Sequence, residues 1–530
     1  MVTQSGTPNA QPPAGDALAM NQAGASESHP GTAPLADLKT RTARGAVVSA
    51  GAQVATLFFR TGSMMIMARL LLPQDFGLVG MVTAFTGFLG LFKDAGLSMA
   101  TIQRASITTA QTSTLFWINM VVGGLLTAFA TVAAPILSVF YGEPRLLWVT
   151  MALGTSFLFN GGAAQHRAML QRNMRFGTLA IIDIVSLVLG TAAGIGAALA
   201  GMRHWALVIM TVAQPAVALA AVWVATGWIP GRPQRGSGVR SMLWFGGTIT
   251  LNSVVVYVAY NVDKVLLGKF WGADALGVYG RAYQLINLPT ENLNSTLGSV
   301  AFPVLARVQH EPERLKRYFL KGYSLFLTLV MPITMGCALF ADDIVRVFLG
   351  AKWHEAAGVF RLMAPTIVAF ALINPLAWLM LAVGQAGRSL RIAFVIAPVV
   401  VLSYALGLKQ GPHGVAAGFS LAMALLVVPV VWWAKAGTLI TGSDILKTAL
   451  MPFLAILAGA AVAWGAGGLV THIQPTFIRL VVETAILFGV YLLVLLFVMK
   501  QKSVYLELLR STGFWKSRGG AKQEKADQPA

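Results

Sequence analysis

The chain has 530 residues, of which 56% are hydrophobic and 11% are charged, and its formal net charge is +19. Soluble proteins carry about 25% charged residues, so this deficit and the repeated apolar runs exclude an ordinary soluble domain and indicate a membrane protein. The single cysteine, Cys337, excludes an internal disulfide and a cysteine-based zinc cluster.

Apolar runs long enough to cross a bilayer as helices recur along the chain. We therefore expect an all-α polytopic membrane protein with about fourteen transmembrane helices. Residues 1–38 and 501–530 are rich in small and polar residues, and we expect them to be cytoplasmic tails, the first of them disordered. The expected spans are 45–67, 76–99, 113–139, 146–168, 177–200, 204–226, 242–267, 275–304, 318–340, 357–382, 391–408, 413–433, 448–470 and 477–499.

The distribution of Lys and Arg between these spans predicts the orientation of the chain. When the N-terminus is placed in the cytoplasm, most of these cations fall on the cytoplasmic side, as the positive-inside rule requires. The positive net charge is then explained without nucleic acid as a partner. An even number of spans places both termini in the cytoplasm.

An internal repeat relates the two halves of the chain. "ARLLLPQDFGLVG" (68–80) aligns with "GKFWGADALGVYG" (268–280) at an offset of 200, and "ILSVFYG" (136–142) is similar to "IVRVFLG" (344–350). The same order of motifs in both halves predicts two pseudo-symmetric six-helix lobes around a central cavity, as in transporters built from parallel repeats. The predicted units are the N-lobe 39–228, the C-lobe 229–434 and two further helices within 435–500.

The connections between spans leave no room for a catalytic domain, since none exceeds roughly 20 residues. The sequence has no phosphate-binding loop of the G-x-x-x-x-G-K-[ST] type, and its seven histidines are not paired at metal-ligand spacing. We therefore predict a transporter rather than an enzyme, with no catalytic residue, metal or cofactor.

Polar residues recur at helical spacing in two spans. In 45–67 and in 275–304 they follow steps of three and four residues, so each set lies on one helix face. We interpret both stripes as walls of a water-filled cavity, while the alternative is that they are buried helix–helix contacts that satisfy each other. The stripes comprise Ser49, Gln53, Thr56, Arg60 and Ser63, and Arg281, Gln284, Asn287, Glu291, Asn294 and Gly298.

Depth in the membrane selects candidate site residues from these stripes and their neighbours. Arg60 and Glu291 lie deep in their spans and are the central candidates, whereas Asp263 and Lys264 lie closer to the outer surface and are either gate residues or interface anchors. The cavity candidates are Gln53, Thr56, Arg60, Tyr257, Tyr260, Asn287, Glu291 and Asn294. The gating or coupling candidates are Lys93, Asp94, Asp263, Lys264 and Arg281.

Several segments of the chain resemble one family of membrane transporters. The sequences "ARLLLPQDFGLVGM", "FKDAGLSMATIQR", "FYGEP", "NVDKVLLGKFWGADALGVYGRAYQL" and "VAFPVLARVQ" are similar to the polysaccharide and O-antigen (Wzx-like) flippases. These belong to the multidrug/oligosaccharidyl-lipid/polysaccharide (MOP) exporter superfamily. The resemblance extends from about residue 38 to about residue 500.

The resemblance implies a fold, an activity and partners. The fold would be two six-helix lobes in a V shape, and the activity would be transfer of an undecaprenyl-diphosphate-linked oligosaccharide across the bacterial inner membrane. The lipid bilayer, and also a polysaccharide polymerase and its chain-length machinery, would be partners. Arg60 would then bind the diphosphate, because Arg matches phosphate geometry, and Gln53, Asn287, Asn294, Tyr257 and Tyr260 would contact sugars.

Three other functions remain open from the sequence. A cation-coupled multidrug or small-molecule exporter of the same superfamily would rely on acids such as Glu291 and Asp94, although Arg60 on the facing stripe weighs against cationic drugs. A lipid II flippase would also have fourteen helices. A polysaccharide polymerase or ligase would be expected to need a large outer loop, which the sequence lacks.

Overall fold

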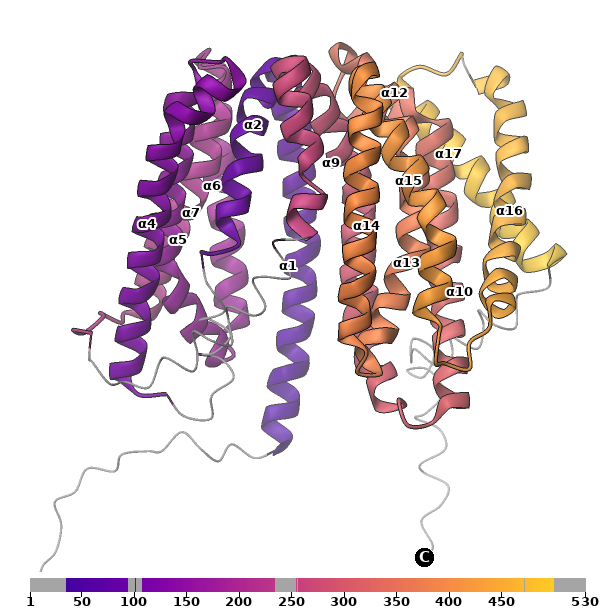
Figure 1. The fold of residues 1–530 in the computed structure, drawn as a ribbon, viewed down its shortest axis with the longest axis horizontal. Coiled ribbons are helices and arrows are strands. Elements are labelled where there is room, and N and C mark those ends of the chain that lie inside the picture. Colours follow the sequence, from indigo (N-terminus) through magenta and orange to yellow (C-terminus); the bar gives the residue numbers. More distant parts are fainter. Residues whose placement is uncertain are drawn as a thin grey trace, which may run out of the picture.

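The computed structural model describes residues 35–93, 101, 107–233, 254, 256–470 and 472–499, with side chains from residue 51 onward except at 469 and 470. Within these ranges the secondary structure is helical and contains no strand. Asp94 and the two predicted tails, apart from residues 35–38, lie outside the described residues. The helices form two groups that stand side by side in Figure 1, and we call them the N-terminal and C-terminal bundles.

Within the described residues, the N-terminal bundle has six long helices. They are α1 (Leu35–Leu70), α2 (Pro73–Gly90), α4 (Thr109–Tyr141), α5 (Leu146–Arg172), α6 (Phe176–Leu199) and α7 (His204–Thr226). Local sequence signals explain where several of them begin and end. Thr108 caps α4, because its hydroxyl accepts a hydrogen bond from the backbone N–H of Gln111, and Gly142 ends that helix with a positive φ of 69°.

The C-terminal bundle runs from α9 to α17. Within it, α9 (Val262–Arg307) is interrupted at Gly272, where a φ of 81° separates a short arm from a long arm. The remaining helices are α10 (Pro312–Leu339), α11 (Ala341–Phe348), α12 (His354–Met363), α13 (Pro365–Ala382), α14 (Ala386–Gly407), α15 (Gly411–Ala434), α16 (Gly442–Val470) and α17 (Thr476–Leu493).

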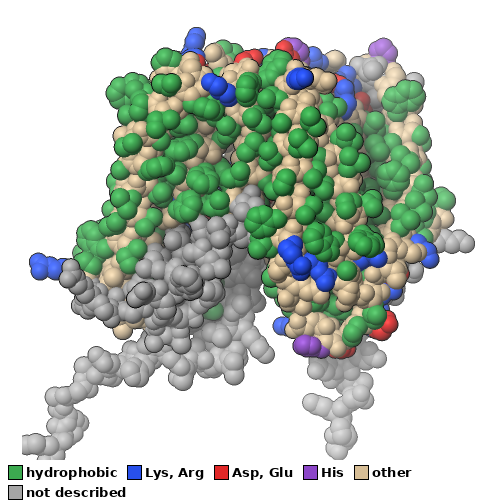
Figure 2. Space-filling view, viewed as in Figure 1, with side chains coloured by type: hydrophobic (Ala, Val, Ile, Leu, Met, Phe, Trp, Pro, Cys, Tyr) green, Lys and Arg blue, Asp and Glu red, His purple; other side chains and the backbone are tan. Residues whose placement is uncertain are grey.

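Helix composition separates lipid-facing from interior helices. Among the described residues, nine helical stretches are long and apolar enough to cross a membrane, one of them running through α14 and α15 together. The helices α1, α2 and α9 are not among the nine, because polar and charged residues lower their mean hydropathy. Hydrophobic side chains cover the flanks of both bundles in Figure 2, so the protein is a multi-pass membrane protein.

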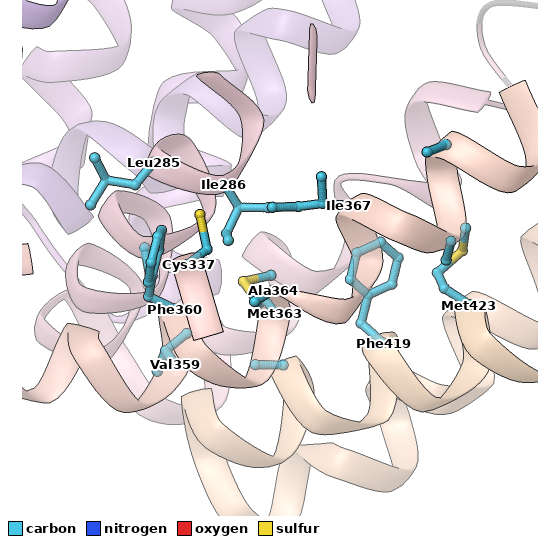
Figure 3. Close-up of a cluster of buried hydrophobic side chains, with 14 of the residues drawn as sticks. Leu285, Ile286, Cys337, Val359, Phe360, Met363, Ala364, Ile367, Phe419 and Met423 are labelled. Atoms are coloured by element: carbon cyan, nitrogen blue, oxygen red, sulfur yellow. The ribbon is translucent and has the colours of Figure 1, made fainter. Parts of the chain in front are cut away.

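The packed interior of the C-terminal bundle holds its helices in place. Phe360 and Met363 of α12, Ile367 of α13 and Phe419 of α15 are at most 1% exposed and belong to one apolar cluster. Figure 3 shows them with Cys337 of α10, which is also buried. Close packing of this kind makes the bundle a rigid wall against which α9 is positioned.

Candidate substrate cavity

A cavity of about 610 Å³ lies between the two bundles. Helices α1, α2, α6 and α7 form its wall on one side, and α9 with the two preceding residues Tyr257 and Asn261 forms the other. Its polar lining residues are Arg60, Ser63, Thr83, Thr191, Thr211, Gln214, Tyr257, Asn261, Lys264, Arg281, Tyr283, Gln284, Asn287 and Glu291. The three helices α1, α2 and α9 thus supply most of the wall of this cavity.

Three cations and one acid line the cavity. Arg60 of α1 is exposed to the cavity, Lys264 and Arg281 project from α9, and Glu291 lies further along the same helix. Within the described residues, none of these four side chains makes a salt bridge. The cavity is therefore net positive, and its cations are available to an anionic ligand.

The partners of these charged groups are neutral. The guanidinium of Arg281 lies 4.4 Å from the ring centre of Phe76, and no hydrogen-bond acceptor for its Nε is found in the described part of the chain. Lys264 donates a hydrogen bond of 2.6 Å to the Asn261 amide oxygen and lies over the Tyr283 ring. Cation–π contacts and neutral acceptors orient a cation without cancelling its charge.

The predicted site residues separate into two groups in the structure. Arg60, Tyr257, Asn287 and Glu291, predicted to bind substrate, line the cavity together with the gating candidates Lys264 and Arg281. Tyr257 also donates a hydrogen bond of 3.0 Å to the Ala84 carbonyl of α2, so it bridges the two bundles. The candidates that do not line the cavity are Gln53, Thr56, Lys93, Tyr260, Asp263 and Asn294.

Two of the remaining candidates have clear surroundings of their own. Tyr260 is packed between Phe370 and Phe419, with ring centres 6.1 and 6.3 Å away. Asp263 is fully buried in α9, and its carboxylate accepts a hydrogen bond of 2.7 Å from the Tyr279 hydroxyl. Because Asp263 and Tyr279 lie on opposite arms of α9, this bond holds the bend at Gly272 closed. A gating or coupling role for Asp263 stays a prediction.

Several cavity residues were absent from the predicted site. Thr191 of α6, and Thr211 with Gln214 of α7, lie in mostly apolar helices that have too few polar residues to form a long stripe. The Thr191 hydroxyl lies 3.3 Å from the hydroxyl of Ser63 on α1, which links α6 to the cavity wall. Among the described residues, no group of three acidic, histidine or cysteine side chains could hold a metal ion.

Known proteins share sequence with much of this chain. The sequence profile of a family described as "Polysaccharide biosynthesis protein" matches residues 66–358, more than half of the chain. The teichuronic acid biosynthesis protein TuaB of Bacillus subtilis is 30% identical over 325 residues, which cover 61% of this chain and 66% of TuaB. The lipopolysaccharide biosynthesis protein WzxC of Escherichia coli is 24% identical over 394 residues, which cover 72% of this chain and 79% of WzxC.

A solved structure shares the fold. The lipid II flippase MurJ, in an inward closed conformation, matches with a TM-score of 0.68 at 15% identity, and the match covers 87% of this chain and 99% of MurJ. This likeness confirms the predicted all-α membrane fold of the MOP type. The family match includes both copies of the repeated loop, 68–80 and 268–280, on which the predicted resemblance rests. The chain belongs to the polysaccharide biosynthesis protein family of membrane proteins.

Proposed function

We propose that the protein is a flippase that moves an undecaprenyl-diphosphate-linked oligosaccharide across the bacterial inner membrane for the synthesis of exopolysaccharide, capsule or O-antigen. The observation that carries the proposal is the polar, net positive cavity enclosed between two bundles with apolar flanks. Such a cavity gives a charged, hydrophilic head group a path through the membrane while its lipid tail stays in the bilayer. In this role the protein is a carrier and performs no catalysis.

The diphosphate of the substrate would bind among the cations of the cavity. Arg60 is the leading candidate because its guanidinium is exposed to the cavity and, within the described residues, makes no ion pair. Lys264 and Arg281 face the same space from the other bundle. A ligand held between them would contact both bundles at once, which couples binding to their relative position.

The sugars would occupy the uncharged part of the site. Tyr257 and Asn287 line the cavity and offer hydroxyl, amide and aromatic surfaces for sugar rings. Gln53 and Thr56 lie on α1 one to two helical turns from Arg60, on the side toward its N-terminus, so they would contact a head group that extends beyond the cavity. Tyr260 and Asn294 do not line the cavity in this conformation, and they would contact sugars only in a conformation in which the bundles are arranged differently.

The transport cycle would follow from the two-lobe plan. We propose that residues 39–228 rock against residues 229–434, and that the two last helices move with the second lobe. Both termini would lie in the cytoplasm, and Lys93 and Asp94 would lie near the inner end of the transport path. A polysaccharide polymerase and its chain-length machinery would receive the product at the outer surface.

Two other functions of the superfamily are less well supported. A cavity lined by three cations and one acid would repel organic cations, so it does not favour a multidrug exporter for such substrates. A lipid II flippase has the same fold, but MurJ is 15% identical to this chain whereas TuaB and WzxC are 30% and 24% identical. The relatives in sequence thus favour an oligosaccharide of polysaccharide synthesis as the head group.

The proposed activity is tested directly with purified protein. The protein would be reconstituted into liposomes that contain a fluorescent undecaprenyl-diphosphate oligosaccharide, and appearance of the label in the opposite leaflet would be followed over time. We expect transfer of this lipid and not of a neutral glycolipid with the same tail. Equal transfer of both, or of neither, would contradict the proposal.

The proposed orientation predicts the labelling of single cysteines at both ends of the chain. In a Cys337→Ser background, Ser5→Cys and Ser511→Cys should react with a membrane-impermeant maleimide in inside-out vesicles and not in right-side-out vesicles, because positively charged loops stay in the cytoplasm. Gln410→Cys, in the exposed turn between α14 and α15, should show the opposite pattern. Reaction of the terminal cysteines from the outside would overturn the topology.

A further inference from the structure

Helices α2 and α9 cross with their backbones in direct contact. A methyl group added to Gly77 of α2 would overlap the carbonyl oxygen of Ala273, and one added to Gly277 of α9 would overlap the carbonyl oxygen of Pro73. Only glycine permits this approach, because any other residue carries a Cβ atom where the partner's backbone lies. We call the contact formed by Gly77, Gly277, Pro73 and Ala273 the glycine crossing.

The two contacts of the glycine crossing use equivalent positions of the internal repeat. Gly77 and Gly277 are 200 residues apart, and so are Pro73 and Ala273. Each half of the chain therefore places its glycine against the equivalent backbone position of the other half. A contact that uses the same positions twice is typical of a self-complementary interface built around a two-fold axis.

The crossing borders one end of the cavity. Directly beside it, Leu276 lies 3.4 Å from the position that a Cβ atom would take on Gly80, and Phe76 covers the guanidinium of Arg281 at 4.4 Å. All four of these residues line the cavity. Because the helices touch backbone to backbone here, no change of side-chain rotamer opens a passage, and opening requires that α2 and α9 move apart.

Three hydrogen bonds from basic side chains also connect the bundles at this end. Lys352 donates one of 2.8 Å to the Arg69 carbonyl, and the other two are related by the internal repeat. Arg69, at the end of α1, donates a hydrogen bond of 3.0 Å to the Val347 carbonyl near the end of α11. Lys269, in the short arm of α9, donates one to the Phe140 carbonyl near the end of α4. A cation at a helix C-terminus is favourable because the last carbonyl groups have no intrahelical partner. We call the two bonds donated by Arg69 and Lys269 the basic clasps.

The basic clasps follow the same repeat. Arg69 and Lys269 are again 200 residues apart, and their acceptors lie in the two similar segments 344–350 and 136–142. The two donors, Arg69 and Lys269, are exposed, and the two acceptor carbonyls lie near helix ends. A hydrogen bond at such a place contributes little to stability and is easily broken. The clasps thus suit a contact that is made and broken repeatedly.

We propose that the glycine crossing and the basic clasps form the outer gate of the cavity, and that the gate opens by separating these four contacts together. The name outer rests on the proposed function, since it follows from the cytoplasmic N-terminus of α1. In Figure 1 the crossing helices α2 and α9 meet at the end opposite the start of α1, and the two bundles separate toward that start. The described conformation is therefore closed on the outside.

The experiment measures access to the cavity from each side of the membrane. In the full chain with Cys337→Ser, the substitution Thr83→Cys places a single thiol on the cavity wall, where Thr83 is exposed. A membrane-impermeant maleimide is applied separately to right-side-out and inside-out vesicles. We expect slow labelling from the outside and faster labelling from the inside.

Gate variants should raise the rate of labelling from the outside. Gly77→Ala or Gly277→Ala adds an atom that overlaps the opposing backbone, and we expect labelling to rise at least about tenfold, as overpacking of a close contact requires. Matched controls are Gly90→Ala in α2 and Gly322→Ala in α10, where nothing lies within 4 Å of the added atom. Both controls should label at the parent rate.

A second variant protects the test against misfolding of the glycine variants. Arg69→Met with Lys269→Met keeps the exposed stems and removes both donors, and should raise outside labelling about threefold or more. Outside labelling that stays at the control rate in both the glycine and the clasp variants overturns the gate, as does fast outside labelling of the parent. The assay uses no lipid-linked substrate, so failure of the flippase proposal would leave its result readable.

Discussion

Arg60→Ala is expected to reduce transfer of the lipid-linked oligosaccharide roughly 10- to 100-fold. A hydrogen bond to a charged group contributes about 1.5–3 kcal/mol, and among the described side chains of α1 Arg60 is the cation on the cavity wall. The folded protein should be unaffected, with its free energy of unfolding changed by less than about 0.5 kcal/mol, because Arg60 is exposed and has no ion-pair partner among the described residues.

The measurement combines transfer rate with thermal unfolding in detergent. Arg60→Lys should be intermediate, since Lys keeps the charge but cannot bind a phosphate with two parallel hydrogen bonds. Arg317→Ala, an exposed arginine of α10 outside the cavity, is the matched control and should transfer substrate at the parent rate. Full activity of Arg60→Ala would remove the assignment of this residue to the diphosphate.

Asp343→Ala is expected to destabilise the protein by about 3–5 kcal/mol. The Arg479 guanidinium of α17 donates hydrogen bonds to both carboxylate oxygens of Asp343 on α11, and the two side chains are only 18% and 9% exposed. Removing Asp343 leaves the Arg479 charge, which is largely out of water, with only the nearby Glu483 carboxylate to compensate it, and breaking a largely buried pair in this way is costly. We expect this loss to appear first as detachment of α17, since the pair joins it to α11.

Its neighbour in the sequence supplies the control. Asp342 pairs with Arg361, but those side chains are 73% and 48% exposed, so Asp342→Ala should cost no more than about 1 kcal/mol. Arg479→Met combined with Asp343→Ala should cost less than the sum of the two single changes, because the double variant leaves no arginine charge without its Asp343 partner. Equal loss of stability in Asp342→Ala and Asp343→Ala would show that the buried pair has no special role.

Local periodicity predicted much of the cavity wall. Arg60, Asn287 and Glu291 were selected because polar residues three and four apart share a helix face, and the structure places all three on the cavity. The same stripes also contain Gln53, Thr56 and Asn294, which lie beyond the cavity lining. Periodicity identifies the polar face of a helix but not the part of that face that the opposing bundle meets. The sequence therefore could not tell which residues of each stripe line the cavity and which lie beyond it.

Charge and composition were less informative where a single residue acts alone. Lys264 and Arg281, predicted as gating residues, line the same cavity as Arg60, and a gating role for them stays a prediction. Thr191, and Thr211 with Gln214, lie in mostly apolar helices whose few polar residues did not mark them as part of the cavity. Their position depends on how α6 rotates when it packs against α1 and how α7 rotates when it packs against α6, α5 and α2, and part of this packing is between helices distant in the sequence.

The sequence by itself determined that this is a helical membrane protein, which segments are apolar enough to span, and that a loop at 68–80 recurs at 268–280, because these depend on local composition and order. Only the tertiary structure decided that the two copies cross, with Gly77 against Ala273 and Gly277 against Pro73. The physical reason is that backbone contact between α2 and α9 requires the whole of both bundles to be packed. Nothing in either copy of the loop alone specifies its partner.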